Sequence, residues 1–165
     1  SMARALNLQQ GLPVTTVRFF NTVGPKQTGQ YGMVVPRFVK AALNGEDIVI
    51  FGDGSQTRVF CHVQDAISAV LKLLEASKSV GEVYNIGGEG EVSIKALAET
   101  VIRVTGSKSK LTFKSYADAY PVGYEDMQRR VPNTAKIRNL TGWAPKHNLE
   151  SIIKDVANFH SQSKE

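Results

Sequence analysis

Apolar residues recur along the chain at two spacings, which predict short strands alternating with helices. Runs of β-branched and aromatic residues predict strands at residues 12–20, 48–51, 59–62, 82–86 and 111–114. Apolar positions at helical spacing predict helices at residues 3–10, 33–44, 65–76, 94–105, 134–140 and 149–159. This alternation is typical of an α/β fold, and we expect one small mixed sheet with surrounding helices.

The helix predicted at residues 65–76 has the clearest periodicity. Its apolar residues at i, i+3, i+4 and i+7 are expected to face the core: Ile67, Val70, Leu71 and Leu74. Asp65 precedes this face, and we expect it to cap the helix. Residues typical of helix ends bound the other predicted helices: Ser93 and Asn148 at the starts, Gly45, Gly106 and Gly142 at the ends.

Length and composition are those of an ordinary globular domain. The chain has 165 residues, of which 42% are hydrophobic and 21% charged, enough to bury a sizeable core. No apolar run approaches the roughly 20 residues needed to span a bilayer, so we expect no membrane partner. Cys61 is the single cysteine, which excludes an intrachain disulfide and favours a reducing, cytoplasmic setting.

The net charge of +5 favours an anionic partner. Basic residues are scattered, no run of five like charges occurs, and aromatics are not interleaved with them as a single-strand platform requires. We therefore expect a small phosphorylated ligand rather than nucleic acid, and keep polyanion binding as a lesser hypothesis. Arg58, Arg129 and Arg130 are the candidates for phosphate contact, with the amide of Asn21, because the guanidinium fork suits bidentate recognition. Surface salt bridges are the alternative for each arginine.

Catalytic motifs give no reaction. The chain has no phosphate-binding loop, no Gly-x-Gly-x-x-Gly after a strand and no Gly-x-Ser-x-Gly elbow. Cys61 beside His62 resembles a nucleophile and its base, but neighbouring strand residues point to opposite faces, so a buried Cys61 is the preferred interpretation. His62, His147 and His160 lie far apart along the chain, and no metal site is expected. Tyr116, Tyr120 and Tyr124 are interpreted as packing residues.

Four segments in order carry a resemblance that covers nearly the whole chain: RFFNTVGPKQTGQYG from Arg18, FGDGSQTRVFCHVQDA from Phe51, GEVYNIGG from Gly81 and RRVPNTAKIRNLTGWAPK from Arg129. Together they closely resemble the carboxyl-terminal half of NAD-dependent nucleoside-diphosphate-sugar epimerases and dehydratases. This is the extended short-chain dehydrogenase/reductase family, which includes UDP-glucose 4-epimerases and UDP-glucuronate decarboxylases. The resemblance implies a substrate-binding domain together with the last strand of a Rossmann half.

The resemblance also implies a role for particular residues. Asn21 matches a contact to the substrate diphosphate or sugar, and Phe19 and Phe20 match the strand end beside the nicotinamide. Arg58 matches a phosphate-binding arginine, and Arg130 a second one, with Arg129 as its register alternative. The remaining matches are to residues beside the nucleotide: Val35 at a helix start, Phe51 at the base and Asn133 at the ribose. The family often has aspartate at the position of Asn133, which leaves its ribose role in doubt.

The family's glycine-rich NAD loop and catalytic Tyr-x-x-x-Lys both precede the strand at Leu12, and no tyrosine of this chain has a lysine four residues later. We therefore expect residues 1–24 to be the tail of a dinucleotide-binding domain and residues 25–165 a nucleotide-sugar-binding domain. The parent would use NAD and a UDP- or dTDP-sugar, whereas this chain alone would hold NAD weakly and have no catalytic residue or turnover. Apolar surface left for the cofactor half would bind that half or favour self-association. A non-enzymatic binding or interaction module derived from such an enzyme is the alternative.

Overall fold

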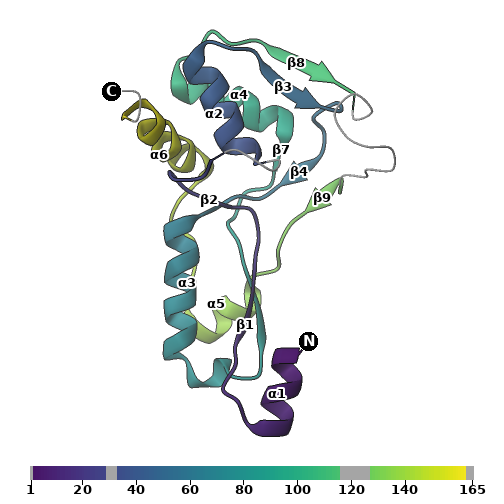
Figure 1. Cartoon of the computed structure of the whole chain (residues 1–165), viewed down its shortest axis with the longest axis vertical. Coiled ribbons are helices and arrows are strands. Elements are labelled where there is room, and N and C mark those ends of the chain that lie inside the picture. Colours follow the sequence, from purple (N-terminus) through teal and green to yellow (C-terminus); the bar gives the residue numbers. More distant parts are fainter. Residues whose placement is uncertain (1, 29–32, 116–126, 163–165) are drawn as a thin grey trace.

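A computed structural model of the chain describes residues 2–28, 33–115 and 127–162. Short strands alternate with helices, which confirms the α/β class (Figure 1). The helices are α1 (Met2–Gln10), α2 (Val34–Asn44), α3 (Val63–Glu75), α4 (Ile94–Thr105), α5 (Ala135–Thr141) and α6 (Leu149–Gln162), with a 3-10 turn at Ser77–Ser79. The strands are β1 (Thr16–Phe19), β2 (Thr22–Val23), β3 (Ile48–Phe51), β4 (Thr57–Arg58), β5 (Cys61–His62), β6 (Val83–Ile86), β7 (Val92–Ser93), β8 (Leu111–Lys114) and β9 (Arg129–Arg130).

The strands form four small sheets in the described residues, and not the single mixed sheet expected from the sequence. Three are parallel pairs, β1 with β6, β2 with β5 and β3 with β8. The fourth is mixed, because β4 runs antiparallel to β7 and parallel to β9. Several of these strands have only two residues, too few to extend one continuous ladder, so helices and loops hold the pairs together.

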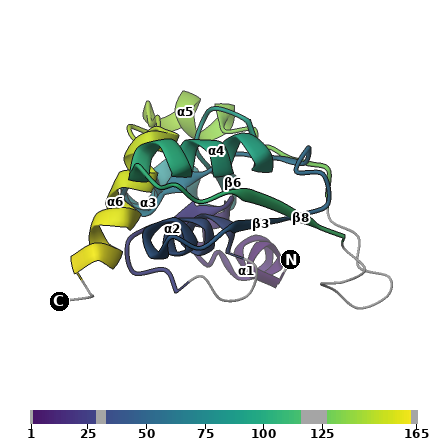
Figure 2. The ribbon, with the colours of Figure 1, turned by 90° about the horizontal axis from the view of Figure 1, so that it is seen from above.

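The buried apolar side chains form two clusters at opposite ends of the elongated molecule. The first gathers α2, α4, α6 and β3 in the upper part of Figure 1, and Figure 2 shows α6 beside α2 and α4. The second gathers α3, α5, β5 and the parallel pair β1–β6 in the lower part of Figure 1, around Trp143. The short sheets β2–β5 and β7–β4–β9 lie between the two ends.

The predicted helix ends agree with the structure at most positions. Ser93 caps α4 by accepting a hydrogen bond from the Ala96 amide at 3.1 Å, and Asn148 accepts one from the Ser151 amide at 2.9 Å at the start of α6. Glycines in the left-handed conformation end three helices: Gly45, Gly106 and Gly142. No helix in the described part of the chain is long and apolar enough to cross a bilayer.

Helix α3 buries a different face from the predicted one. Of the predicted face only Val70 packs against the second cluster, while Ile67, Leu71 and Leu74 are exposed. The buried residues Ala66, Ala69 and Leu73 face β5 and α5 instead. The small alanines let α3 lie close to its neighbours, and this closeness outweighs the larger apolar area on the other face. The predicted cap is also wrong: His62 accepts from the Gln64 amide at 3.2 Å, and Asp65 is buried beside residues 143–147.

Two adjacent leucines of α3 test this orientation. Leu73 is 2% exposed and Leu74 75% exposed. We expect Leu73→Ala to lower the free energy of unfolding by about 2–5 kcal/mol, because it opens a cavity in the second cluster. The matched variant Leu74→Ala should change it by less than about 0.5 kcal/mol. Urea unfolding followed by far-UV circular dichroism measures both, and a larger loss from Leu74→Ala would contradict the orientation described.

Candidate functional site

The carboxyl ends of β1 and β6 meet at a place where the backbone is tightly enclosed. The Phe20 amide donates to the Ile86 carbonyl at 2.9 Å, which extends the pair by one residue beyond β1. A Cβ atom at Gly87 would lie 2.4 Å from the Pro132 side chain, and one at Gly88 would lie 1.9 Å from the Phe60 carbonyl oxygen. Only glycine fits at these two positions, so the Gly-Gly pair brings the strand end against the segments carrying Phe60 and Pro132.

Asn21 occupies the turn between β1 and β2 with a positive φ of 41°. Its side-chain amide donates to the Val59 carbonyl at 2.8 Å, and its Oδ1 accepts from the Arg130 guanidinium. Its main-chain carbonyl accepts from the Cys61 amide at 3.1 Å. Asparagine tolerates the left-handed region better than most residues, and here both ends of its amide join separate segments. The structure thus brings Asn21 and Arg130 together, although they are 109 residues apart in the chain.

Arg58 and Arg130 lie side by side on the small mixed sheet. They are register partners in the parallel pair β4–β9, so both side chains leave the same face of that sheet. Arg58 is only 7% exposed, and its Nη1 donates to the Thr57 carbonyl at 2.8 Å. The Arg130 Nε is buried and has no hydrogen-bond partner within the described residues. The result is two arginines on one face of the sheet, one of which, Arg130, has a buried Nε–H that no described residue accepts.

Arg129, the register alternative, points the other way. Its guanidinium binds both carboxylate oxygens of Glu91, at 2.9 Å from Nε and 2.8 Å from Nη2. The hydrogen bond and charge of this pair lower the pKa of Glu91 and raise the pKa of Arg129. Because neighbouring strand residues alternate in direction, only one of the two arginines can share a face with Arg58, and it is Arg130.

The other predicted residues lie on several elements and differ in exposure. Phe19 is exposed at the end of β1, and Phe51 ends β3 with the Arg37 guanidinium 4.7 Å from its ring centre. Val35 is buried in the first cluster, which leaves its backbone rather than its side chain for a ligand. No side chain of the described residues caps the start of α2, where backbone amides favour an anion. Asn133 is exposed, and its Oδ1 accepts from the Ala135 amide at 3.0 Å.

Gln56 belongs to this surrounding and was not singled out from the sequence. It is buried, and its side-chain amide donates to the Phe51 carbonyl at 3.2 Å, which closes the turn that leads to Arg58. A glutamine inside a Gly-Asp-Gly-Ser-Gln turn was the available signal, but a turn residue is ordinarily exposed.

Cys61 and His62 do not form a nucleophile and base. Burial raises the pKa of the Cys61 thiol to about 12. The thiol contacts the main-chain oxygen of His62, at 3.6 Å from Sγ, and not the imidazole ring. The predicted burial of Cys61 is confirmed. The predicted packing role of Tyr116, Tyr120 and Tyr124 concerns residues outside the described ranges.

A surface pocket of about 470 Å³ lies beside the site, lined by residues 22–27 and Val63. It begins one residue after Asn21 but includes neither arginine of the pair. The pocket and the arginine pair are therefore separate features. The arginine pair is the stronger candidate for a ligand site, because guanidinium groups can bind an anion through charge-assisted hydrogen bonds.

The architecture is that of an α/β protein in which the end of a parallel strand pair meets a smaller sheet bearing a pair of arginines. The sequence model of the NAD dependent epimerase/dehydratase family matches residues 1–87. The chain belongs to this family, within the extended short-chain dehydrogenases/reductases.

Curated relatives with catalytic names align over most of the chain. It is 40% identical over 148 residues to the UDP-N-acetyl-alpha-D-glucosaminuronate decarboxylase of Bacillus cytotoxicus, covering 89% of this chain and 46% of that protein. It is 33% identical over 159 residues to UDP-glucuronic acid decarboxylase 1 of Xenopus tropicalis, covering 96% of this chain and 36% of that protein. The chain thus spans less than half the length of these two relatives.

Solved structures agree in fold. The UDP-glucose 4-epimerase of Thermotoga maritima, determined with UDP-glucose, superposes with a TM-score of 0.86 at 29% identity, covering 98% of this chain and 50% of that one. The dTDP-glucose 4,6-dehydratase of Bacillus anthracis, determined with NAD, gives a TM-score of 0.85 at 29% identity, covering 99% and 49%. The described strands and helices are therefore arranged as in about half of each enzyme.

Two substitutions at Asn21 test its backbone conformation. Asn21→Ala and Asn21→Gly both remove the contacts to Val59 and Arg130, but only alanine is strained at a positive φ. Glycine also loses more conformational entropy on folding than alanine, which offsets part of this difference. We therefore expect the alanine variant to be only about 0.5–1 kcal/mol less stable than the glycine variant. Chemical denaturation compares them directly, and an alanine variant as stable as the glycine variant would show that Asn21 is not held in the left-handed region.

Proposed function

We propose that this chain is the nucleotide-sugar-binding portion of an NAD-dependent nucleoside-diphosphate-sugar epimerase, dehydratase or decarboxylase. Arg58 and Arg130 would bind the diphosphate, and Asn21 would position the second arginine and contact the diphosphate or sugar. The observation that carries this proposal is their common face on β4–β9, with Asn21 bound to Arg130. Two arginines on one sheet face are suited to an anion with two phosphates, because each guanidinium can donate two parallel hydrogen bonds to phosphate oxygens.

The nucleotide would lie between these arginines and the first cluster. The amides at the start of α2, around Val35, would face anionic oxygen, and Phe51 would border the base. Asn133 would contact the ribose through its Nδ2 group, because its Oδ1 already accepts from the Ala135 amide. Uridine is the first base to test, because the curated relatives named above act on UDP-sugars.

NAD would belong to the parent enzyme rather than to this chain. Phe19 and Phe20, at the end of β1, would form one wall beside the nicotinamide, which supplies and accepts hydride when bound. The chain has no glycine-rich loop of the dinucleotide-binding type and no tyrosine followed four residues later by lysine. We therefore assign it no catalytic residue and only weak affinity for NAD.

The division of the chain into residues 1–24 and 25–165 is part of the same proposal. The second hydrophobic cluster packs β1, from the first of these segments, against α3, β6 and α5 of the second, so the two segments would share one core. Ile67, Leu71 and Leu74 leave an apolar stripe exposed on α3. This stripe would be covered by the cofactor half, or else by a second copy of this chain.

A cytosolic location stays a prediction, which rests on the single cysteine of the chain.

Titration of the chain with UDP and dTDP tests the proposed diphosphate site. We expect Arg58→Gln and Arg130→Gln each to weaken nucleotide binding by about tenfold or more, because a hydrogen bond to a charged group contributes on the order of 1.5–3 kcal/mol. Isothermal titration calorimetry measures the dissociation constants, with circular dichroism to check that each variant is folded.

Arg129→Gln is the matched control for this titration, since it removes one positive charge from the next residue on the opposite face of β9. It should leave the affinity within about twofold, the effect of a screened surface charge. Equal losses from Arg129→Gln and Arg130→Gln would indicate a general charge effect. Failure of the unmodified chain to bind either nucleotide would favour the non-enzymatic interaction module.

Turnover tests the assignment of the reacting groups to the half of the relatives that this chain does not cover. We expect the chain mixed with NAD and UDP-glucose or UDP-glucuronic acid to give no epimer, ketosugar or decarboxylated sugar, because no base and hydride acceptor are held together. Proton NMR of the reaction mixture over a day detects each product. Sustained product formation that scales with chain concentration would contradict this assignment.

A further inference from the structure

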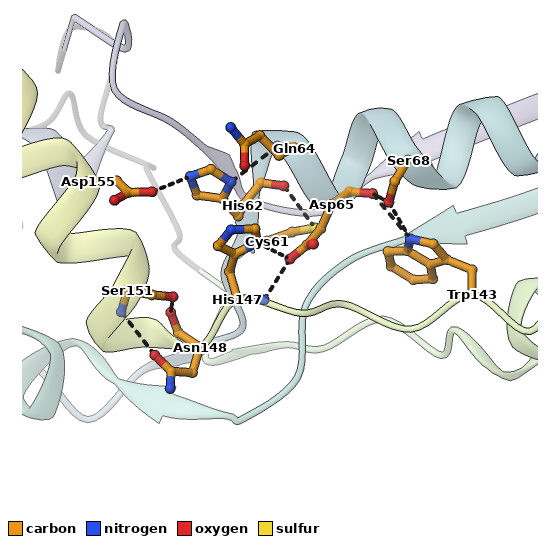
Figure 3. A network of polar contacts seen from close by, with 10 residues as sticks. All are labelled: Cys61, His62, Gln64, Asp65, Ser68, Trp143, His147, Asn148, Ser151 and Asp155. Atoms are coloured by element: carbon orange, nitrogen blue, oxygen red, sulfur yellow. Dashed lines mark hydrogen bonds and ion pairs between the residues drawn. The ribbon is translucent and has the colours of Figure 1, made fainter.

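Two histidines that lie 85 residues apart in sequence stack on each other in a polar network near the start of α3 (Figure 3). The rings of His62 and His147 have their centres 4.1 Å apart and an interplanar angle of 25°. His62 ends β5 and is 1% exposed, and His147 comes from the segment between α5 and α6. Their separation along the chain hid this pairing from the sequence.

A carboxylate lies at each side of the stack. Asp155 of α6 places Oδ2 3.4 Å from His62 Nε2, and Asp65 of α3 places Oδ2 3.0 Å from His147 Nδ1. Asp65 also accepts from the His147 amide at 3.0 Å, and its main-chain carbonyl accepts from the Trp143 indole at 3.2 Å. The four side chains thus connect α3, α6 and the segment between α5 and α6.

The hydrogen bond at the start of α3 determines where the proton of His62 lies. Its Nδ1 accepts from the Gln64 amide at 3.2 Å, so the neutral ring carries its hydrogen on Nε2, toward Asp155. A second proton would have to go onto Nδ1, which points at an N–H donor. Protonation of His62 therefore removes the cap of α3 and sets a positive charge against the positive end of the helix.

The same geometry argues against a bound cation. His62, His147 and Asp155 offer atoms within 4.8 Å of one another. However, the free nitrogen of His62 holds a proton when Nδ1 accepts from Gln64, and a neutral imidazole binds metal through an unprotonated nitrogen. The rings are also nearly parallel, so their in-plane lone pairs do not converge on one point.

The position of the stack makes it a connection between the clusters. β5 and α3 belong to the second cluster, which includes Cys61 and Trp143, whereas α6 contributes Ile152, Ile153 and Val156 to the first. Strand β5 also pairs with β2, and His62 is the register partner of Val23. A change at His62 therefore reaches α6 on one side and the turn at Asn21 on the other.

We propose that the His62–His147 stack, bounded by Asp65 and Asp155, is a proton-sensitive element: neutral His62 caps α3, and its protonation at mildly acid pH removes this cap and destabilises the start of α3. This inference stands on the contacts above and does not depend on the proposed function.

The charges around His62 give the direction of the pH effect. Burial and the neighbouring His147 lower the pKa of His62, while Asp155 and Asp65 act in the opposite direction with less effect. The Cys61 thiol, with its pKa raised to about 12, stays neutral throughout. Because the unfolded chain binds a proton on this residue more readily, folding stability is complete above the ordinary histidine pKa of roughly 6.5 and declines as pH falls through the lowered value.

Thermal unfolding between pH 7.5 and 5.5 measures the effect of protonating His62, because this window brackets the ordinary histidine pKa of roughly 6.5. We expect the melting temperature of the unmodified chain to fall by on the order of 3 °C. His62→Asn should abolish at least half of this fall, since asparagine caps a helix but does not titrate. His147→Gln is the second variant, which removes the neighbouring ring and keeps the main-chain bond to Asp65. It should also reduce the fall.

His160→Gln is the matched control, because His160 lies on α6 and contacts Phe159 rather than the stack. Its pH profile should equal that of the unmodified chain. In parallel, NMR should show His62 titrating below the ordinary histidine value, with the Gln64 amide losing its protection from hydrogen exchange over the same pH range.

Three results would overturn the proposal. These are a pH profile unchanged in both His62→Asn and His147→Gln, a Gln64 amide that stays protected while His62 titrates, and a Zn²⁺-dependent rise in melting temperature that His62→Asn abolishes. The last would make the cluster a metal site.

Discussion

Two glycines at the end of β6 let the backbone pass so close to Pro132 and to the Phe60 carbonyl that no Cβ atom fits at either position. This close passage places the segments that carry Asn21, Arg58 and Arg130 around one point. Phe60 follows the strand of Arg58 by two residues, Pro132 follows Arg130 by two, and Phe20 precedes Asn21. A larger residue at Gly88 would push Phe60, and with it the Arg58 segment, away from β6. This movement would disturb the contact between Asn21 and Arg130 as well.

The arginine pair shows how a short sheet can bring two basic side chains from distant segments onto one face. β4 and β9 have two residues each, yet their register is enough to set Arg58 and Arg130 side by side and to turn Arg129 toward Glu91. Burial adds to the effect, because a guanidinium removed from water gains more from an anionic partner than an exposed one does. The ion pair of Arg129 is exposed and screened, which makes it a useful contrast within the same strand.

The two hydrophobic clusters give the chain two centres of stability joined through polar contacts. Trp143, Asp65 and Ser68 fasten the segment after α5 to α3, and Asn148 starts α6 two residues after Lys146. Buried polar groups stabilise such a junction only when they have hydrogen-bond partners, since an unpaired buried donor costs on the order of 1–3 kcal/mol of folding free energy. The stacked histidines belong to this junction, and imidazole is the side chain whose ordinary pKa lies nearest to neutral pH.

Local sequence predicted the helices and the longer strands, with many of their ends, but missed the two-residue strands β2, β4, β7 and β9. Ile48–Phe51 and Leu111–Lys114 are strands with the predicted bounds, and Ser93, Asn148 and three glycines bound helices as expected, because β-branched runs, caps and left-handed glycines act within a few residues. The ordered motifs also identified the family and the residues to examine. Only the tertiary structure decided which face of α3 is buried, which arginine of the Arg129–Arg130 pair joins Arg58, and that His62 meets His147. Each of these depends on contacts between segments far apart in the chain, where packing distance and strand register outweigh the periodicity of any one segment.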